Sequence, residues 1–221
     1  MKKVLAVTVM SFFILNSAFS APVLNEMQIK NLNLKTAPMA ITDQAVLSKV
    51  FSSYNPGALP FDFYKNNKEQ VLGELANHEV SLKAYSVAAD GKVTFLTALI
   101  SGASKKVVVQ RDYINYKYVK IDGQSKKVGV VFRIEAELET RKADVDLNGL
   151  FAVGLAVKTG AASGQLRVKV HGLSGEPIST LIPSPSDVSE QSIQNAMEAV
   201  ALLKAKLYDP KVNVIPQEIA E

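Results

Sequence analysis

The feature that most constrains this chain is a pair of long alternating runs between residues 105 and 138, separated by Asp122-Gly123-Gln124-Ser125. In the second run, apolar residues occupy the even positions: Val128, Val130, Phe132, Ile134, Ala136 and Leu138. The odd positions between them are largely charged. Alternation with a period of two is typical of a strand that buries one face. The two runs and their Gly-containing turn predict a central antiparallel hairpin.

The register of this hairpin follows from which residues share its apolar face. Ile114, Tyr116 and Tyr118 alternate in the first run, and we expect them to lie on the apolar face of the second. Paired residue numbers then sum to an even value, 246 or 248, and Lys117 lies on the charged face. A sum of 246 gives a three-residue turn and a sum of 248 gives a five-residue turn, and the sequence does not distinguish between these two registers. Arg111-Asp112 interrupts the alternation, which predicts a bulge or strand break.

Three more strands are expected outside the hairpin. Runs at 79–88 and 92–101 flank Ala89-Asp90-Gly91, and Asp-Gly is a strong hairpin signal. Residues 101–104 form a small-residue turn into the central pair, which makes a four-strand meander. The run at 165–171 alternates charged residues with three apolar ones, Leu166, Val168 and Val170. This fifth strand would bring cations near Glu135 and Glu137 on a solvent-facing surface of mixed charge.

Helical spacing of apolar residues marks three further segments. Thr42 is expected to cap a helix that ends at Tyr54, and Asn66 or Asn67 a second helix that runs to His78. Ser189 is expected to cap the last helix, whose apolar stripe is Ile193, Met197, Val200, Leu203 and Leu207. The fold class is therefore α+β: an approximately five-stranded, mostly antiparallel meander sheet with one face covered by helices, including a C-terminal amphipathic helix.

Two apolar segments need separate interpretation. Leu147–Val157 is apolar on almost every side, which is typical of a buried helix or of one that touches a membrane. It is too short to span a bilayer, so burial at one end of the sheet is the favoured interpretation. Leu59–Tyr64 is rich in aromatic residues, and we expect this loop to plug the end of the core rather than to bind a partner.

The first 20 residues have the pattern of an export signal. Lys2 and Lys3 precede an apolar run, and Ala18-Phe19-Ser20 fits a cleavage site before Ala21. We therefore expect a cleaved signal peptide at 1–20, an extended arm at 21–40, one domain at 41–210 and a tail at 211–221. The chain has no cysteine, so neither a lipid-modified cysteine nor a disulfide is possible. The expected location is the periplasm or the extracellular space.

The charge balance does not point to nucleic acid. The net charge of +4 falls to +2 when Lys2 and Lys3 are removed, and tryptophan is absent. A lysine-rich stretch at 105–127 is interpreted as solvated strand edges rather than as a dedicated anion site.

One segment resembles part of a metal-binding loop in its spacing. Asp144, Asp146 and Asn148, followed by Gly149, match the first half of a calcium-binding loop. Leu155 stands where the pattern requires a bidentate glutamate. We therefore favour the alternative, a short strand that contains Val145 and ends in an Asn-Gly turn.

Catalytic patterns are weaker still. The two histidines, His78 and His171, are not spaced for zinc, and no Gly-x-Ser-x-Gly motif is present. A serine hydrolase assembled by folding stays open without a motif to support it. The carboxylates Glu135, Glu137 and Glu139 share one strand face, which more often carries solvated charge than an acid/base pair. No catalytic residue, metal or cofactor is assigned.

These patterns favour a non-enzymatic binding or assembly protein of the cell envelope. Its partner is expected to be a protein or a small polar ligand, bound by one charged sheet face with six residues: Lys117, Arg133, Glu135, Arg167, Lys169 and His171. The alternatives are peripheral membrane contact through Leu147–Val157 and, less favoured, a secreted hydrolase. The sequence does not indicate an oligomeric state.

Overall fold

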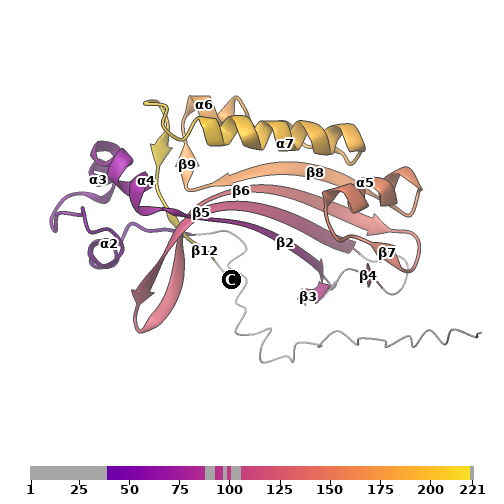
Figure 1. Ribbon diagram of the computed structural model, residues 1–221, viewed down its shortest axis with the longest axis horizontal. Coiled ribbons are helices and arrows are strands. Elements are labelled where there is room, and N and C mark those ends of the chain that lie inside the picture. The colour runs from indigo at the N-terminus through magenta and orange to yellow at the C-terminus, as the bar shows by residue number, and fades with distance from the viewer. Residues whose placement is uncertain (1–38, 88–92, 97–98, 101–105, 220–221) are drawn as a thin grey trace, which may run out of the picture.

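The computed structural model describes residues 39–87, 93–96, 99–100 and 106–219. In these residues the chain combines a curled antiparallel sheet with six helices, as Figure 1 shows, so the predicted α+β class is confirmed. The main sheet has the order β1-β12-β6-β5-β2-β3, and β8 joins the outer edge of β6.

The central hairpin consists of β5 (Lys106–Ile121) and β6 (Gln124–Thr140). Its turn contains only Asp122 and Gly123, with φ angles of 52° and 77°. Two positive φ angles define a type I′ turn, whose twist matches that of the flanking strands. Ile121 pairs with Gln124, so paired residue numbers sum to 245 along the hairpin. The predicted sums of 246 and 248 are therefore both wrong.

The odd register reverses the expected placement of β5. Lys117 pairs with Val128 on the helix-covered face, while Ile114 and Tyr116 lie on the other face with Val131. Sequence reasoning excluded this register because it places a lysine in the apolar row, but Lys117 has partners there, described below. The expected bulge at Arg111-Asp112 is also wrong, since β5 pairs with β6 without interruption from Lys106 to Ile121. Asp112 lies directly opposite Arg133, so the charged residue fits a regular ladder.

The order of the strands departs from a meander. The expected hairpin of β2 (Asn77–Val87) and β3 (Val93–Leu96) forms, although its turn lies outside the described residues. However, β5 pairs with β2 and not with β3. Because β2 is 11 residues long and β3 only four, pairing with β2 gives the long β5 a far longer ladder.

Two strands share the outer edge of β6. β8 (Ala162–His171) pairs with residues 131–140, and β12 (Gln217–Ile219) pairs with residues 127–129. β1 (Met39–Ala40) adds to β12, and β10 (Ser186–Asp187) adds to β8. Residues 39–40 and 217–219 thus contribute strands to the main sheet.

Two small two-stranded sheets complete the strand list. β9 (Leu173–Ser174) pairs with β11 (Asn213–Val214), and β4 (Leu99–Ile100) pairs with β7 (Val145–Asp146). β7 confirms the short strand that was favoured over a calcium loop, and the side chain of Asp146 accepts a hydrogen bond from the Asn148 N–H.

Three short helices lie together at one end of the sheet (Figure 1). α2 (Gln44–Val50) is capped by Asp43 rather than Thr42 and ends before Tyr54. α3 (Pro60–Asn66) forms where a loop was expected, because Pro60 at its first turn has a φ angle suited to helix initiation. α4 (Lys68–Glu74) stops before His78, which belongs to β2.

The aromatic residues of α3 confirm the expected plug. Phe63 and Tyr64 are buried, and their rings contact those of Phe51 and Tyr54. Phe61, in contrast, points into solvent.

The remaining helices are α5 (Leu150–Lys158), α6 (Glu176–Ser179) and α7 (Glu190–Ala205). Ser189 caps α7 as expected, through a capping box with Ser192. The expectation of an all-round buried helix is wrong for α5, because only the side that contacts β8 and α7 is covered. Phe151 and Leu155 on its other side are 77% and 58% exposed.

The core lies on one face of the sheet. The even residues of β6, such as Phe132 and Ile134, pack with Leu47 of α2, Leu150 of α5 and Leu203 of α7. We call the opposite side the open face. In the described part of the chain, no helix is long and apolar enough to cross a membrane.

Candidate functional site

Five of the six predicted binding residues lie together on the open face. Arg133 and Glu135 occupy odd positions of β6, where side chains point away from the helices. β8 lies antiparallel to β6 and places Lys169 opposite Arg133, Arg167 opposite Glu135, and His171 opposite Val131. The expected approach of β8 cations to β6 carboxylates is therefore confirmed.

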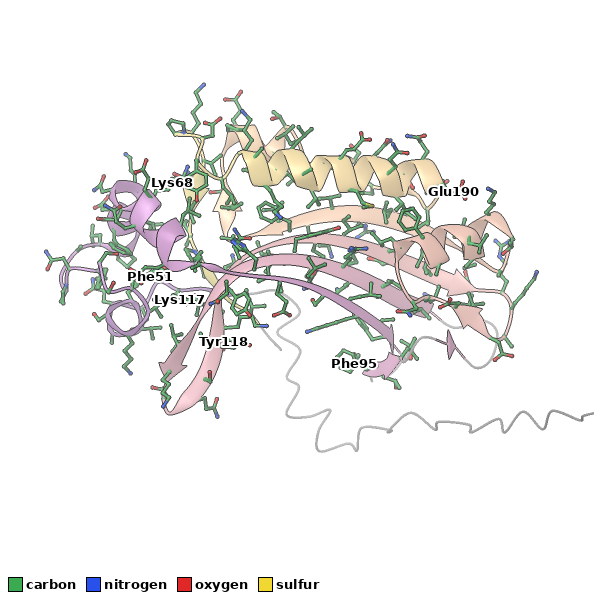
Figure 2. The ribbon with its side chains drawn as sticks, viewed as in Figure 1. Phe51, Lys68, Phe95, Lys117, Tyr118 and Glu190 are labelled. Atoms are coloured by element: carbon green, nitrogen blue, oxygen red, sulfur yellow. The ribbon has the colours of Figure 1, made fainter. Side chains whose placement is uncertain are left out.

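Lys117 lies on the helix-covered face instead. Its Nζ donates to the carbonyl of Val50 at 2.6 Å and to Oε2 of Glu74 at 2.6 Å. Nζ also lies 5.6 Å from the ring centre of Phe51, and Figure 2 shows these two side chains near α2. Burial raises the pKa of Glu74, but hydrogen bonds from Lys117 and Ser52 outweigh it, and the pKa is lowered. Lys117 thus joins α2 and α4 to β5.

The centre of the open face is a buried ion pair. Arg133 donates from Nε to Oδ1 of Asp112 at 2.7 Å and from a terminal nitrogen to Oδ2 at 2.8 Å. Asp112 is only 3% exposed. Desolvation lowers the pKa of Arg133, but the hydrogen bonds to Asp112 outweigh it and raise the pKa. This bidentate geometry fixes both side chains.

A second buried carboxylate, that of Glu135, lies two residues beyond Arg133 on β6. Glu135 accepts hydrogen bonds from Lys169 Nζ and, at 2.8 Å, from Gln110 Nε2. Gln110 also contacts the hydroxyl of Tyr85 at 2.9 Å. Burial raises the pKa of Glu135, yet these hydrogen bonds outweigh it and the pKa is lowered. Glu135 therefore stays ionised at neutral pH.

His171 lies beside the Asp112–Arg133 pair. Desolvation and the positive charge of Arg133 lower its pKa to about 4. Its Nε2 atom is buried and has no hydrogen-bond partner in the structure. The imidazole is therefore neutral at physiological pH.

The charged face was expected to be solvated, and its centre is not. Asp112 and Glu135 are 3% and 5% exposed. The network is accessible at Lys169, whose side chain is 40% exposed, and at its edge, where Arg167 lies 3.4 Å from Glu137 and both side chains are over one third exposed. Next to this pair is a depression of about 420 Å³ whose polar lining comes from Lys106, Glu137, Glu139, Ser163 and Gln165.

The other end of the open face is aromatic and apolar. Ile114, Val131 and Ile219 form a small second core, against which Tyr116 packs. Tyr116 and Tyr118 meet edge to face at 5.2 Å, with Lys127 Nζ 4.7 Å from the first ring centre and 5.6 Å from the second. Tyr118 is half exposed and is labelled on the hairpin in Figure 2.

Sequence reasoning missed Asp112, Gln110 and the tyrosine cluster as members of this face. The even register placed Tyr116 and Tyr118 on the core face. The break in alternation at Arg111-Asp112 was interpreted as a bulge. The signal that could have found them was the Asp122-Gly123 dipeptide, because a two-residue type I′ turn fixes an odd sum.

The protonation state of Glu135 limits the acid/base chemistry of this face. An ionised Glu135 has no proton to give, so it cannot act as a general acid. Among the residues that the structure describes, no hydrogen bond joins either histidine to a serine, and no group of three His, Asp or Glu side chains is placed to hold a metal ion.

No protein-family model, curated protein or solved structure shows significant similarity to the chain.

Proposed function

We propose that this protein is a non-enzymatic binding or assembly module that uses the open face to bind a polar partner, either a protein segment or a small polar ligand. The observation that supports this best is the exposed Arg167–Glu137 pair at the edge of the ionic network, next to the 420 Å³ depression that Glu137 lines. The neighbouring pairs Asp112–Arg133 and Glu135–Lys169 are already held by hydrogen bonds, so they lose little conformational entropy when a partner binds beside them.

Site-specific photo-crosslinking tests the proposal. A photoreactive residue at Gln165, which lines the depression, is expected to give a discrete adduct in cells, whereas one at exposed Gln191 on α7 gives none. Arg167→Ala in the Gln165 background is expected to reduce the adduct. Equal adducts from both positions, or none from Gln165, would contradict the proposal.

We also propose that the protein acts in the periplasm or outside the cell, exported by a signal peptide at residues 1–20. The pattern of Lys2, Lys3 and the apolar run that follows supports this. N-terminal sequencing of the protein from its native compartment is expected to begin at Ala21. A chain that retains Met1 would contradict cleavage.

The same proposal includes an amphipathic role for α7. Its buried residues include Ile193, Val200 and Leu203, while Gln191 and Glu198 are exposed. This distribution supports a helix that covers the apolar face of the sheet and leaves the open face to the partner.

A second candidate function is peripheral membrane contact through α5. The exposure of Phe151 and Leu155 on one side of this helix supports it. Sedimentation with vesicles is then expected to survive high salt, to be lost in detergent, and to fall in the double variant Phe151→Ser/Leu155→Ser. A protein that stays in the supernatant under all conditions would exclude this function.

A further inference from the structure

Two cations on the helix-covered side of the sheet lack an anionic partner. Arg111 Cζ lies 5.4 Å and Lys204 Nζ 5.6 Å from the ring centre of Tyr113. Neither cation makes an ion pair with any residue that the structure describes, and the Nε atom of Arg111 is buried without a hydrogen-bond acceptor. Arg111 is partly buried and Lys204 is exposed, so the two cations around this ring form an accessible positive site that would attract an anion.

An apolar groove leads to these cations. It lies between α5 and α7, has a volume of about 570 Å³, and takes its apolar lining from Phe151, Ile193, Met197 and Ala201. Met197, Ala201 and Lys204 are spaced by four and three residues, so they lie along one side of α7. Lys204 therefore lies about one helical turn beyond Ala201, the last groove residue of α7, and the stretch of the groove from Ile193 to Ala201 is about 12 Å long.

The sheet beside the cations is apolar and uncovered. Leu82 lies opposite Arg111 and Val80 lies opposite Tyr113 in the ladder of β2 and β5. Their exposed fractions are 39% and 57%. The head of a ligand held by Arg111 and Lys204 would thus be surrounded by apolar surface, which strengthens its electrostatic attraction.

Charge also sets the direction in which a ligand would lie. Glu190 borders the groove at the end away from Lys204, where Figure 2 shows it at the far end of α7, and its carboxylate pairs with Lys158 at 3.1 Å. Glu198 borders the groove between its two ends. Lys158 is thus already neutralised by Glu190 at that end, whereas Arg111 and Lys204 can attract an anionic head at the other. An apolar tail in the groove and an anionic head at the cations satisfy both constraints.

We propose that this trough binds a single lipid-like anion, with its acyl chain in the groove between α5 and α7 and its head group between Arg111 and Lys204. This site lies on the opposite side of the sheet from the open face and goes beyond the proposed function. Each can therefore fail without the other.

Calorimetric titration of the full-length protein with monomeric dodecanoate tests the site. Dodecanoate is expected to bind, while dodecanol, which has the same tail without the charge, and acetate, which has the charge without the tail, bind at least roughly tenfold more weakly. Added salt is expected to weaken dodecanoate binding because the head-group contact is ionic.

Three variants locate the ligand. Lys204→Gln is expected to weaken dodecanoate binding roughly tenfold through loss of a charged hydrogen bond. Ala201→Phe, at an exposed position of the groove, is expected to block the acyl chain and weaken binding by a similar factor. Lys206→Gln is the matched control, because Lys206 pairs with Asp209 and does not line the groove, and it is expected to bind like the wild type.

Three outcomes would overturn the proposal: no binding of monomeric dodecanoate, equal binding of dodecanol, or equal affinity in Lys204→Gln, Ala201→Phe and the wild type. Binding only to anionic vesicles, without binding of the monomer, would also overturn it and would favour membrane contact. Thermal unfolding of each variant confirms that a lost signal reflects a changed site and not an unfolded chain. The photo-crosslink at Gln165 reports on the open face independently.

Discussion

Lys117 illustrates how a charged residue can occupy the helix-covered side of a sheet. Its side chain is only 22% exposed, and its ammonium group donates to a carboxylate from α4 and a carbonyl from α2 and lies near the ring of Phe51. These three contacts replace the water that a buried cation loses. The partner Glu74 is 43 residues away in sequence, which is why the pattern of β5 alone could not indicate the pair.

Removing the carboxylate from this pair is expected to destabilise the fold. Glu74→Ala leaves a largely buried ammonium group without its anion, and we expect a loss of about 1–3 kcal/mol in the free energy of unfolding, measured with urea. The double variant Lys117→Met/Glu74→Ala is expected to recover part of this loss, since no unpaired charge remains.

The exposed pair of Lys49 and Asp122 is the control for that measurement. Its side chains are 51% and 83% exposed, so Lys49→Ala is expected to change stability by less than about 0.5 kcal/mol. Equal effects of Glu74→Ala and Lys49→Ala would contradict a structural role for the Lys117–Glu74 pair.

His171 predicts a pH dependence of stability. Its pKa in the folded protein is about 4, below that of a free histidine, so the unfolded chain takes up the proton first as the pH falls. Stability is therefore full above about pH 6.5 and decreases between about pH 6.5 and 4, by at most about 1.4 kcal/mol per pH unit. Urea unfolding at several pH values in this window measures the slope.

Two variants assign that slope to a residue. His171→Gln is expected to flatten it, whereas His78→Gln, at an exposed position of β2, is expected to leave it unchanged. Glu135, whose folded pKa is lowered, contributes in a separate window, because its stabilisation is lost only below the pKa of a free glutamate. A slope that persists in His171→Gln would show that another group titrates.

At the scale of elements, the hairpin turn determines which residues reach which face. Gly123 has a φ of 77°, a value that costs an alanine about 1 kcal/mol or more. Gly73 lies in α4, where an added Cβ would meet nothing within 4 Å. Gly123→Ala is therefore expected to lower the free energy of unfolding measured with urea. Gly73→Ala is expected to raise it by up to about 1 kcal/mol. The same sign for both would contradict the type I′ turn.

The helices differ in how well local sequence determines them. Ser189 and Ser192 form a capping box within one turn, so the start of α7 could be predicted from neighbouring residues. α2 and α4 end earlier than their apolar spacing suggested. Phe51, Tyr54 and Leu75, which continued that spacing, are buried from irregular segments instead. Burial alone therefore does not identify a residue as helical.

At the scale of the whole molecule, the sequence predicted the strands with long alternation and missed those without it. β5, β6, β8 and the β2–β3 pair follow from period-two patterns. β1 and β12 have two and three residues, too few to show a period; β12 pairs with the edge of β6, and β1 pairs with β12. The strand order depends on ladder length between distant segments, which no local pattern encodes.

The candidate site was predicted in part for the same reason. Five residues were placed on one face because β6 and β8 alternate clearly. The burial of that face depends on Asp112 and Gln110 of β5 and on Tyr85 of β2, which contact its charged residues. Lys204 of α7 contacts Tyr113 of β5, 91 residues away in sequence. The sequence pattern did not indicate this contact because it is not local.

The pairing of β1 with β12 has a consequence for topology. Met39 lies opposite Glu218, so the first and last strands of the described fold are neighbours in one sheet. A short peptide linker between them would close the chain into a ring, and the ring could be reopened in the exposed stretch Arg141–Ala143. Such a circular permutant should keep its sheet, because every strand would retain its partners while only the order of synthesis changed.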